Sequence, residues 1–440
     1  MVTGAQEGRR TLLRRLPLGE ETLPDEIWER TREVVGDVAT PEEAVRKILR
    51  DVREHGDSAV LRYCEAFDGA SYSTLRVAPT EIQGAYDEID DDLLEALRFA
   101  AQRIRAFHEQ QREHVLRSFD HAGIGMKASA LGRVGINAPG TAVVYPSTVL
   151  MTVLPAKAAG VEDVLIASPT DAAGNVSAVK LVAADIAGAD GVFRMSGAQA
   201  MAAFAYGTES VPRVDKVCGP GNLFVTLAKR AMFGDVGIDA LYGPSETIVV
   251  ADEHANAMLC AADLLAQAEH DELATPILIT TSSELAARVG EEVERQLKLL
   301  DREAVARASF EARGGAVVVE SIAEAIALAD EFAPEHLCLL VENAQDWAGK
   351  VRNAGGVFVG EMSPETLGDY TAGPSHAMPT MGSARFASPL GVNDFLKATS
   401  LVAVDEAMLR EIGPAAALIA RAEGFTGHAR TIELRLGKLD

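Results

Sequence analysis

An adjacent acid and imidazole stand in the segment Ala333-Pro334-Glu335-His336-Leu337. A carboxylate can activate a water molecule, and an imidazole can accept the proton of an alcohol, so Glu335 and His336 combine two proton-transfer groups. They come directly before 337–341, an apolar run typical of a buried strand. Because ligands of parallel sheets usually gather at the carboxyl ends of strands, position alone leaves a purely structural Glu-His pair equally open.

Gln267 and His270 are three residues apart near the end of an expected helix, Ala261–His270. That spacing puts both side chains on one face of the helix, where a metal ion could bind from one side. A solvated helix end is the alternative, and the two residues taken alone favour it.

Asp369 and His376 lie in a turn-rich stretch, 363–376, which we expect to form a loop. Loops held by rigid sheets commonly carry function. Asp369 could serve as a metal ligand and His376 as a substrate contact. Ordinary turn chemistry, with Asp following Gly, is the alternative.

His428 follows a Thr at 426 that is expected to be the N-cap of a helix. This places His428 in the first turn, where the helix dipole keeps an imidazole neutral and able to bind a metal.

The segment Cys218-Gly219-Pro220-Gly221-Asn222 lies between an expected strand and an expected helix. Its backbone N–H groups could therefore face a pyrophosphate. It does not match GxGxxG, and a tight strand-to-helix turn is the alternative. Cys218 could attack an aldehyde, but nothing nearby indicates a lowered thiol pKa, so we interpret it as a buried thiol.

Short apolar runs alternate with helical segments from Gly135 onward, which is the βαβ pattern of a parallel sheet covered by helices. A first series of strand candidates comprises 164–166, 191–193 and 214–217, and a second comprises 247–251, 276–280, 316–319, 337–341 and 356–359. The sequence therefore predicts an α/β fold with two Rossmann-like parallel-sheet lobes, a helical N-terminal segment and a small helical C-terminal domain.

Charge and composition narrow the class of partner. The 440 residues include 65 acids and 41 bases, and the net charge of −24 would repel phosphate backbones and anionic membrane surfaces. We expect no nucleic-acid partner. No apolar run approaches the roughly 20 residues of a membrane-spanning helix. The four cysteines form no CxxC pair, and the basic start lacks the apolar region of an export signal, so we expect a cytoplasmic protein.

Several segments together resemble the histidinol dehydrogenase family, in the family's order over roughly residues 35–435. The segments are Tyr145–Met151, Gly197–Ala200, Val214–Lys216, Gly219–Asn222, Gly243–Glu246, Gln267–His270, Pro334–Leu337 and Gly373–Thr380. The resemblance implies an enzyme of histidine biosynthesis that oxidises the amino alcohol L-histidinol through L-histidinal to L-histidine. It also implies two NAD consumed per substrate and one Zn²⁺ per subunit.

The resemblance further implies a set of site residues. Zinc would be bound by Gln267, His270, Asp369 and His428, which would also contact substrate. Glu335 and His336 would be the acid/base pair. Further substrate contacts would be His336, Ser245, His376 and Glu423. The NAD contacts would be Gln199 and Asn222, with Asn137 on the cofactor side. His428 would come from the partner subunit of an intertwined homodimer with shared active sites. A ligand set of nitrogen and oxygen without thiolate suits a zinc ion that stays open to substrate.

This interpretation divides the chain into four parts. Residues 1–35 are an N-terminal arm, and 36–136 with 245–382 form a first α/β lobe that carries the zinc and acid/base residues. Residues 137–244 form a second α/β lobe on the NAD side. Residues 383–440 form a helical C-terminal domain exchanged between subunits.

Two positions depart from the resemblance. Asn137 stands where the family usually has Tyr, so a stacking or hydroxyl contact with NAD would be lost. Tyr242 stands where smaller or aliphatic residues are more usual, and it would reshape the substrate side. Two alternatives follow: a paralogous dehydrogenase for another small polar alcohol such as a sulfonated diol, and an idle zinc-binding or scaffold protein. Glu423 and His428 weigh against the first, and the acid/base pair weighs against the second.

Overall fold

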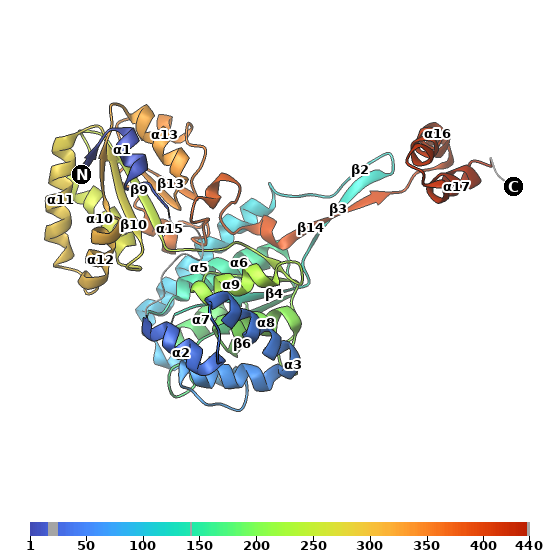
Figure 1. Ribbon diagram of the computed structural model, residues 1–440, viewed down its shortest axis with the longest axis horizontal. Helices are drawn as coiled ribbons and strands as arrows, with labels where there is room; N and C mark the ends of the chain where they lie inside the picture. Colours follow the sequence, from blue (N-terminus) through green and yellow to red (C-terminus); the bar gives the residue numbers. More distant parts are fainter. Residues whose placement is uncertain (16–24, 141–142, 438–440) are drawn as a thin grey trace. The chain divides into compact units, whose positions relative to one another are not determined.

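The computed structural model describes residues 1–15, 25–140 and 143–437. The chain divides into two compact units, Met1–Glu113 with Leu131–Phe395 and His114–Ala130 with Leu396–Asp440. The first unit contains two parallel sheets, and the second contains a small antiparallel sheet and two helices (Figure 1). The α/β fold with two parallel-sheet lobes is therefore confirmed.

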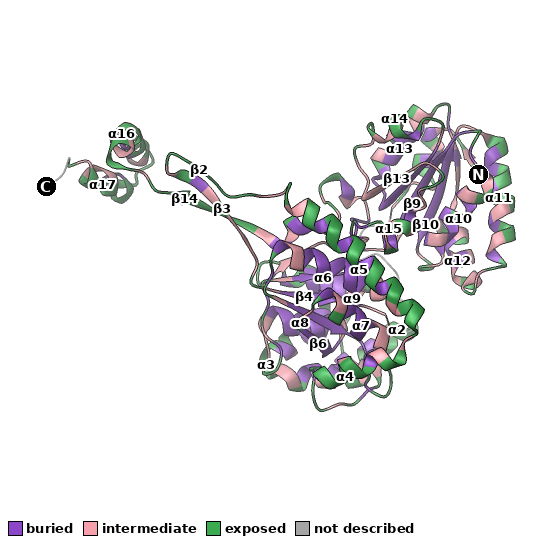
Figure 2. Ribbon diagram, turned by 180° about the vertical axis from the view of Figure 1, so that it is seen from behind, coloured by how far each residue is buried: buried purple, intermediate pink, exposed green. Residues whose placement is uncertain are grey.

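One lobe of the first unit is built on a five-stranded parallel sheet. Its strand order is β6 (Gly191–Arg194), β5 (Asp163–Ser168), β4 (Arg133–Asn137), β7 (Lys216–Cys218) and β8 (Gly237–Ile238). Helices cover both faces. One face is covered by α3 (Pro41–Asp68), α8 (Gly197–Tyr206) and α9 (Leu223–Met232), and the other by α5 (Asp91–Arg112), α6 (Pro146–Ala159) and α7 (Ala178–Ala187). Figure 2 shows the strands and the inner helix faces buried and the outer face of α5 exposed.

The sequence-based division placed 36–136 with the other lobe, and the structure differs. The apolar stripe of α3, including Ile48, joins the same core as Phe193 and Phe204 of the five-stranded lobe. The division was wrong because an amphipathic stripe predicts a helix but does not specify which sheet will bury that helix. α3 begins directly after Thr40, whose side chain caps the helix by accepting a hydrogen bond from the Glu43 N–H at 3.2 Å.

The other lobe is built on a six-stranded parallel sheet. Its strand order is β1 (Val2–Thr3), β11 (Gly315–Val318), β10 (Thr275–Thr280), β9 (Glu246–Ala251), β12 (His336–Leu340) and β13 (Gly356–Val359). One face packs against α10 (Ala257–Ala268), α11 (Ser283–Leu297) and α12 (Glu303–Arg313), and the other against α1 (Ala5–Arg10), α13 (Ile322–Phe332) and α14 (Ala344–Ala348). The three central strands, β10, β9 and β12, are buried on both faces, as their continuous apolar runs predicted, whereas β1, β11 and β13 are only partly buried.

The predicted N-terminal arm, 1–35, is divided between the lobes. β1 pairs with β11, and α1 packs on the six-stranded sheet. α2 (Asp25–Val35) instead contacts α3 of the five-stranded lobe. Short elements complete the first unit: α4 (Pro79–Gly84), α15 (Glu365–Tyr370) and 3₁₀ turns at Ala85–Glu88, Ser383–Arg385 and Val392–Phe395.

The second unit consists of an antiparallel sheet and a helix pair. The sheet has the order β14 (Leu396–Val402), β3 (Ile124–Ala130) and β2 (Phe119–His121), and the helices are α16 (Glu406–Ala422) and α17 (Thr426–Arg435). The prediction of a helical domain over 383–440 was wrong for its first part. Residues 383–395 belong to the first unit, and residues 396–402 form a strand by pairing with β3. Because β3 is remote in sequence, the local sequence of 396–402 did not reveal this pairing. In the described chain, no helix is long and apolar enough to cross a membrane.

Candidate active site

A pocket of about 400 Å³ lies in the first unit, where the ends of the two sheets meet. Pro139 and Asn222 line it just beyond the carboxyl ends of β4 and β7, between which the strand order of the five-stranded sheet reverses. Such a switch point is where ligands of parallel sheets usually bind. Ser245 and His336 line the pocket at the amino ends of β9 and β12. Glu335 and His336, the expected acid/base pair, thus lie at the amino end of their own sheet but face the carboxyl end of the other.

Glu335 and His336 are both buried in this pocket, and His336 is only 2% exposed. His336 Nδ1 lies 3.7 Å from Glu335 Oε2, and Nε2 lies 3.6 Å from Asp369 Oδ1. These distances are too long for hydrogen bonds, and neither ring nitrogen has a hydrogen-bond partner among the described residues. The Glu335 carboxylate accepts a hydrogen bond from the Glu246 backbone N–H at 3.2 Å. Both ring nitrogens of His336 are therefore available to exchange a proton.

Burial and neighbouring charges shift the pKa of both groups. Burial raises the pKa of Glu335, and the charge of Glu246 adds to the rise. Burial alone would lower the pKa of His336, but the carboxylates of Glu335 and Asp369 outweigh it and raise the pKa. Because each group affects the other, the pair loses its protons in two coupled steps that belong to the pair and not to either residue alone.

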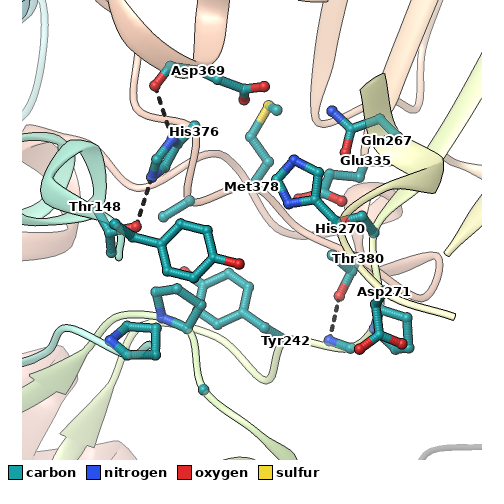
Figure 3. Close-up of a pocket in the computed structure, with 18 of the residues that line it drawn as sticks. Thr148, Tyr242, Gln267, His270, Asp271, Glu335, Asp369, His376, Met378 and Thr380 are labelled. Atoms are coloured by element: carbon teal, nitrogen blue, oxygen red, sulfur yellow. Dashed lines mark hydrogen bonds between the residues drawn. The ribbon is translucent and has the colours of Figure 1, made fainter. Parts of the chain in front are cut away.

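Gln267, His270 and Asp369 surround the same pocket (Figure 3). The amide Nε2 of Gln267 is buried and has no hydrogen-bond partner among the residues the structure describes. Burial lowers the pKa of His270, which keeps its imidazole neutral. Burial raises the pKa of Asp369, but the contact with His336 outweighs this effect and lowers it, so the carboxylate is charged. A buried amide, a neutral imidazole and a carboxylate are all competent metal ligands.

His376 is held on the opposite wall by two hydrogen bonds that Figure 3 draws. Its Nδ1 donates to the Asp369 carbonyl at 3.0 Å, and its Nε2 accepts from the Thr148 hydroxyl at 3.2 Å. Because a carbonyl can only accept, these bonds fix one neutral tautomer. Burial also lowers the pKa of His376.

The segment after β7 forms the turn into α9 that the sequence suggested. Gly219 has φ +99°, and a Cβ on it would meet the Asn137 carbonyl oxygen at 2.3 Å, so the turn requires glycine. Asn222 is the N-cap of α9, and its side chain accepts from the Val225 N–H at 3.2 Å. The Asn137 amide donates to the Pro220 carbonyl at 2.6 Å, which ties the end of β4 to this turn.

A second pocket of about 390 Å³ adjoins the first, because Pro139, Gly221 and Asn222 line both. Asn137 and Gln199 also line the second pocket. All three residues expected to contact a dinucleotide are therefore gathered around one cavity that continues into the acid/base site.

Comparison with known proteins decides the family. A sequence profile described as histidinol dehydrogenase matches residues 31–436. The chain belongs to the histidinol dehydrogenase family. It is 50% identical over 396 residues to a histidinol dehydrogenase of Dehalococcoides mccartyi, covering 90% of this chain and 91% of that protein. It is 48% identical over 417 residues to one of Deinococcus radiodurans, covering 94% and 95%.

A solved structure also matches. The crystal structure of histidinol dehydrogenase from Elizabethkingia anophelis superposes with a TM-score of 0.86 at 33% identity, covering 94% of this chain and 97% of that one. The predicted family and its oxidoreductase class are thereby confirmed.

Glu423 and His428 lie in the second unit. Both are exposed in the single chain, at the end of α16 and in the first turn of α17, where the His428 ring contacts Phe425 with centroids 5.0 Å apart. The N-cap of α17 is Phe425, and Thr426 is the first helical residue instead of the expected cap. The structure describes this unit by itself, so the roles of Glu423 and His428 in the active site stay predictions.

Two local predictions around the candidate ligands were wrong. The stretch 363–376 is not only loop, because α15 forms within it and carries Asp369 in its last turn. A helix of six residues is too short to show a periodic apolar pattern. Helix α10 ends at Ala268, so His270 follows it in a turn, where its N–H donates to the Gln267 carbonyl at 3.1 Å.

The two remaining questions raised by the sequence concern Cys218 and Tyr242. Burial raises the pKa of Cys218 well above its ordinary value, which supports its interpretation as an unreactive thiol. The Tyr242 hydroxyl donates to Asp239 at 2.9 Å, so only its ring is left to shape the pocket.

Buried residues that support the site were missed from the sequence. Lys180 donates to the carbonyls of Pro139 and Gly140 at 2.7 Å each, and Lys229 donates to the Gly219 carbonyl at 2.6 Å. Each lysine thus holds one of the two backbone segments at the carboxyl end of the five-stranded sheet. A lysine inside a mostly apolar helix was the available signal.

Glu365 was also missed, and no sequence signal marked it. It is fully buried behind the pocket and accepts a hydrogen bond from the Thr247 hydroxyl at 2.8 Å. Burial raises the pKa of this carboxyl.

Proposed function

We propose that this chain oxidises L-histidinol through L-histidinal to L-histidine, using NAD as hydride acceptor and one zinc ion per subunit. The observation that carries the proposal is a single buried pocket in which Glu335 and His336 face Gln267, His270 and Asp369. The names of its close relatives support the substrate.

The donor set fits zinc. Gln267, His270 and Asp369 offer nitrogen and oxygen ligands in one cavity, and the Gln267 amide is buried with no partner for its nitrogen in the described chain. No group of three or more His, Cys, Asp and Glu with metal-site geometry occurs within the described ranges. Gln267, His270 and Asp369 would leave one position of a tetrahedral zinc site for a further donor. The exposed His428 is the natural fourth ligand, contributed by the partner subunit of a homodimer. When bound, zinc would hold the substrate's imidazole and amine and lower the pKa of neighbouring groups through its charge.

The adjoining pocket fits NAD. Gln199, Asn222 and Asn137 line it, and the turn at Gly219 lets backbone N–H groups at the start of α9 approach a pyrophosphate. Asn222 lines both this pocket and the pocket of the acid/base pair, so the two pockets adjoin. Hydride transfer requires such closeness between NAD and the substrate.

The chain's own residues divide the chemistry. In the first oxidation His336 takes the hydroxyl proton while the hydride leaves the alcohol carbon for NAD. In the second, Glu335 takes a proton from water as it adds to the aldehyde, and a second hydride leaves the hydrate for another NAD.

Pocket charge bears on the alternative of a sulfonated diol. The described lining residues include the acids Asp271, Glu335 and Asp369 and no lysine or arginine. Such a lining offers no lysine or arginine that could pair with a sulfonate, and burying an anion without such a partner is costly. The free, buried cysteines support the cytoplasmic location, which remains part of the proposal.

A substrate panel tests the proposed function. Purified, zinc-loaded protein with NAD should release NADH from histidinol at a kcat/KM at least roughly 10²-fold above that for a sulfonated propanediol, because no lysine or arginine of the lining could pair with the sulfonate. Histidinamide, which keeps the imidazole and amine but has no alcohol, is the matched control and should inhibit without reacting. A higher kcat/KM for the sulfonate would reject histidinol as the substrate.

Metal removal tests the zinc. Dialysis against a chelator should abolish NADH release, and one equivalent of zinc per subunit should restore it. Full turnover in protein shown to be metal-free would rule out the zinc part of the proposal.

A further inference from the structure

Residues 1–15, the first part of the predicted arm 1–35, are attached to the six-stranded lobe. From here on, the name N-terminal arm refers to residues 1–15 alone. Its strand β1 pairs with β11, and α1 packs on the sheet. The family profile begins at residue 31, so the N-terminal arm precedes the matched range. Its last residue, Arg15, reaches the interior of the lobe.

Arg15 binds Glu246 through a two-pronged ion pair. Its Nε and Nη2 donate to Glu246 Oε1 and Oε2, each at 2.7 Å. The side chain of Arg15 is 20% exposed and that of Glu246 is 6% exposed, so water screens the pair weakly. Parallel guanidinium–carboxylate bonds of this kind are among the strongest and most directional in proteins.

The same guanidinium also holds the turn that leads to the acid/base pair. Arg15 donates to the carbonyls of Phe332 and Ala333, the latter at 3.2 Å, and lies over the Phe332 ring at 3.7 Å. Ala333 has φ 53°, a left-handed conformation that is strained for a residue other than glycine. Glu335 follows two residues later, so Arg15 stabilises a strained turn directly before it.

Both contacts converge on Glu335. Glu246, held by Arg15, donates its backbone N–H to Glu335 Oε2 at 3.2 Å. The turn at Ala333, also held by Arg15, sets the start of the backbone that carries Glu335. Arg15 therefore connects the two segments that fix the position of the Glu335 carboxylate.

Charge makes the ion pair necessary. Without Arg15, Glu246 would be a buried carboxyl without a cationic partner beside a second buried carboxyl, an arrangement that is strongly unfavourable for either ionised group. Burial raises the pKa of Glu246, and Arg15 acts against this rise.

We infer that Arg15 is a positioning residue for Glu335, so that the N-terminal arm completes the acid/base site by pairing with Glu246. The inference rests on the proposed function only for its assay. It assigns the N-terminal arm a part in catalysis in addition to that of the acid/base residues.

The test compares Arg15→Met, Arg15→Lys and the double variant Arg15→Met/Glu246→Gln, with kcat and KM measured for histidinol and for histidinal. Arg15→Met should lower kcat for histidinal by about 10- to 100-fold, the scale of a displaced catalytic group, while KM for NAD stays within about twofold. Arg15→Lys should recover part of the loss. The double variant should be at least about tenfold faster than Arg15→Met, because no unpaired buried carboxylate remains.

Arg9→Met is the matched control. Arg9 belongs to the same arm but pairs with the exposed Glu331 at 2.7 Å, so this variant should keep the parent kcat. The inference is overturned if folded Arg15→Met keeps the parent kcat, or if the double variant is no faster than Arg15→Met. If Arg15→Met fails to fold, the double variant is compared with Arg15→Lys instead. A kcat for histidinal that is more than about 100-fold lower in the double variant than in Arg15→Lys would then overturn the inference. A parent protein inactive on histidinol would instead count against the proposed function.

Discussion

Glu335→Gln is expected to slow histidinal oxidation by roughly 10²–10⁴-fold, the usual effect of losing a general base. The amide keeps the size of the side chain and can still accept the hydrogen bond from the Glu246 N–H, but it cannot take a proton from water. A hydride leaves an aldehyde readily only after water has added, so this step depends on the carboxylate. Histidinol oxidation needs no water and should stay within about tenfold of the parent rate.

Single-turnover NADH formation measures the two steps separately, from histidinol and from supplied histidinal, with zinc and NAD saturating. His336→Asn is the matched variant with the opposite expectation, because it removes the proton acceptor of the alcohol step. A Glu335→Gln protein that oxidises histidinal at the parent rate would show that another group activates the water.

Mixing two inactive variants is expected to restore activity if His428 completes the site of the partner subunit. In a heterodimer of His428→Ala and Glu335→Gln chains, one site receives both substitutions and the other receives neither. Histidine formation should then return to about half the parent rate per dimer, whereas each homodimer should lose roughly 10²-fold or more. Product quantification on heterodimers purified with two affinity tags measures this.

The control pairs Glu335→Gln with Asp369→Ala. Both residues lie in the first unit, so each heterodimer site carries one substitution and no activity should return. Recovery in the control, or none in the His428 mixture, would contradict a shared site.

Local sequence patterns predicted much of the fold. Apolar runs located β9, β10 and β13 to within one residue. These strands are specified by their own local apolar sequence. What failed depends on distant partners: α3 packs on a sheet that begins some 65 residues after its end, and β14 is a strand because it pairs with β3.

The candidate site shows the same division. Residue chemistry alone singled out Glu335, His336 and Asp369, and the structure brings them together in one pocket. Arg15 and Lys180 could not be identified in this way, because their importance lies in hydrogen bonds to remote backbone and carboxylate groups. A charged residue in an apolar setting indicates burial but not its partner.

The most direct test of the central claim is a count of NADH produced per molecule of limiting histidinol, with excess NAD and the product identified by mass. An enzyme that carries the alcohol to the acid in one pocket should form two NADH per histidinol, release histidine and leave no free aldehyde for a trapping amine. A yield of one NADH with trapped histidinal, or no NADH from histidinol, would contradict the account.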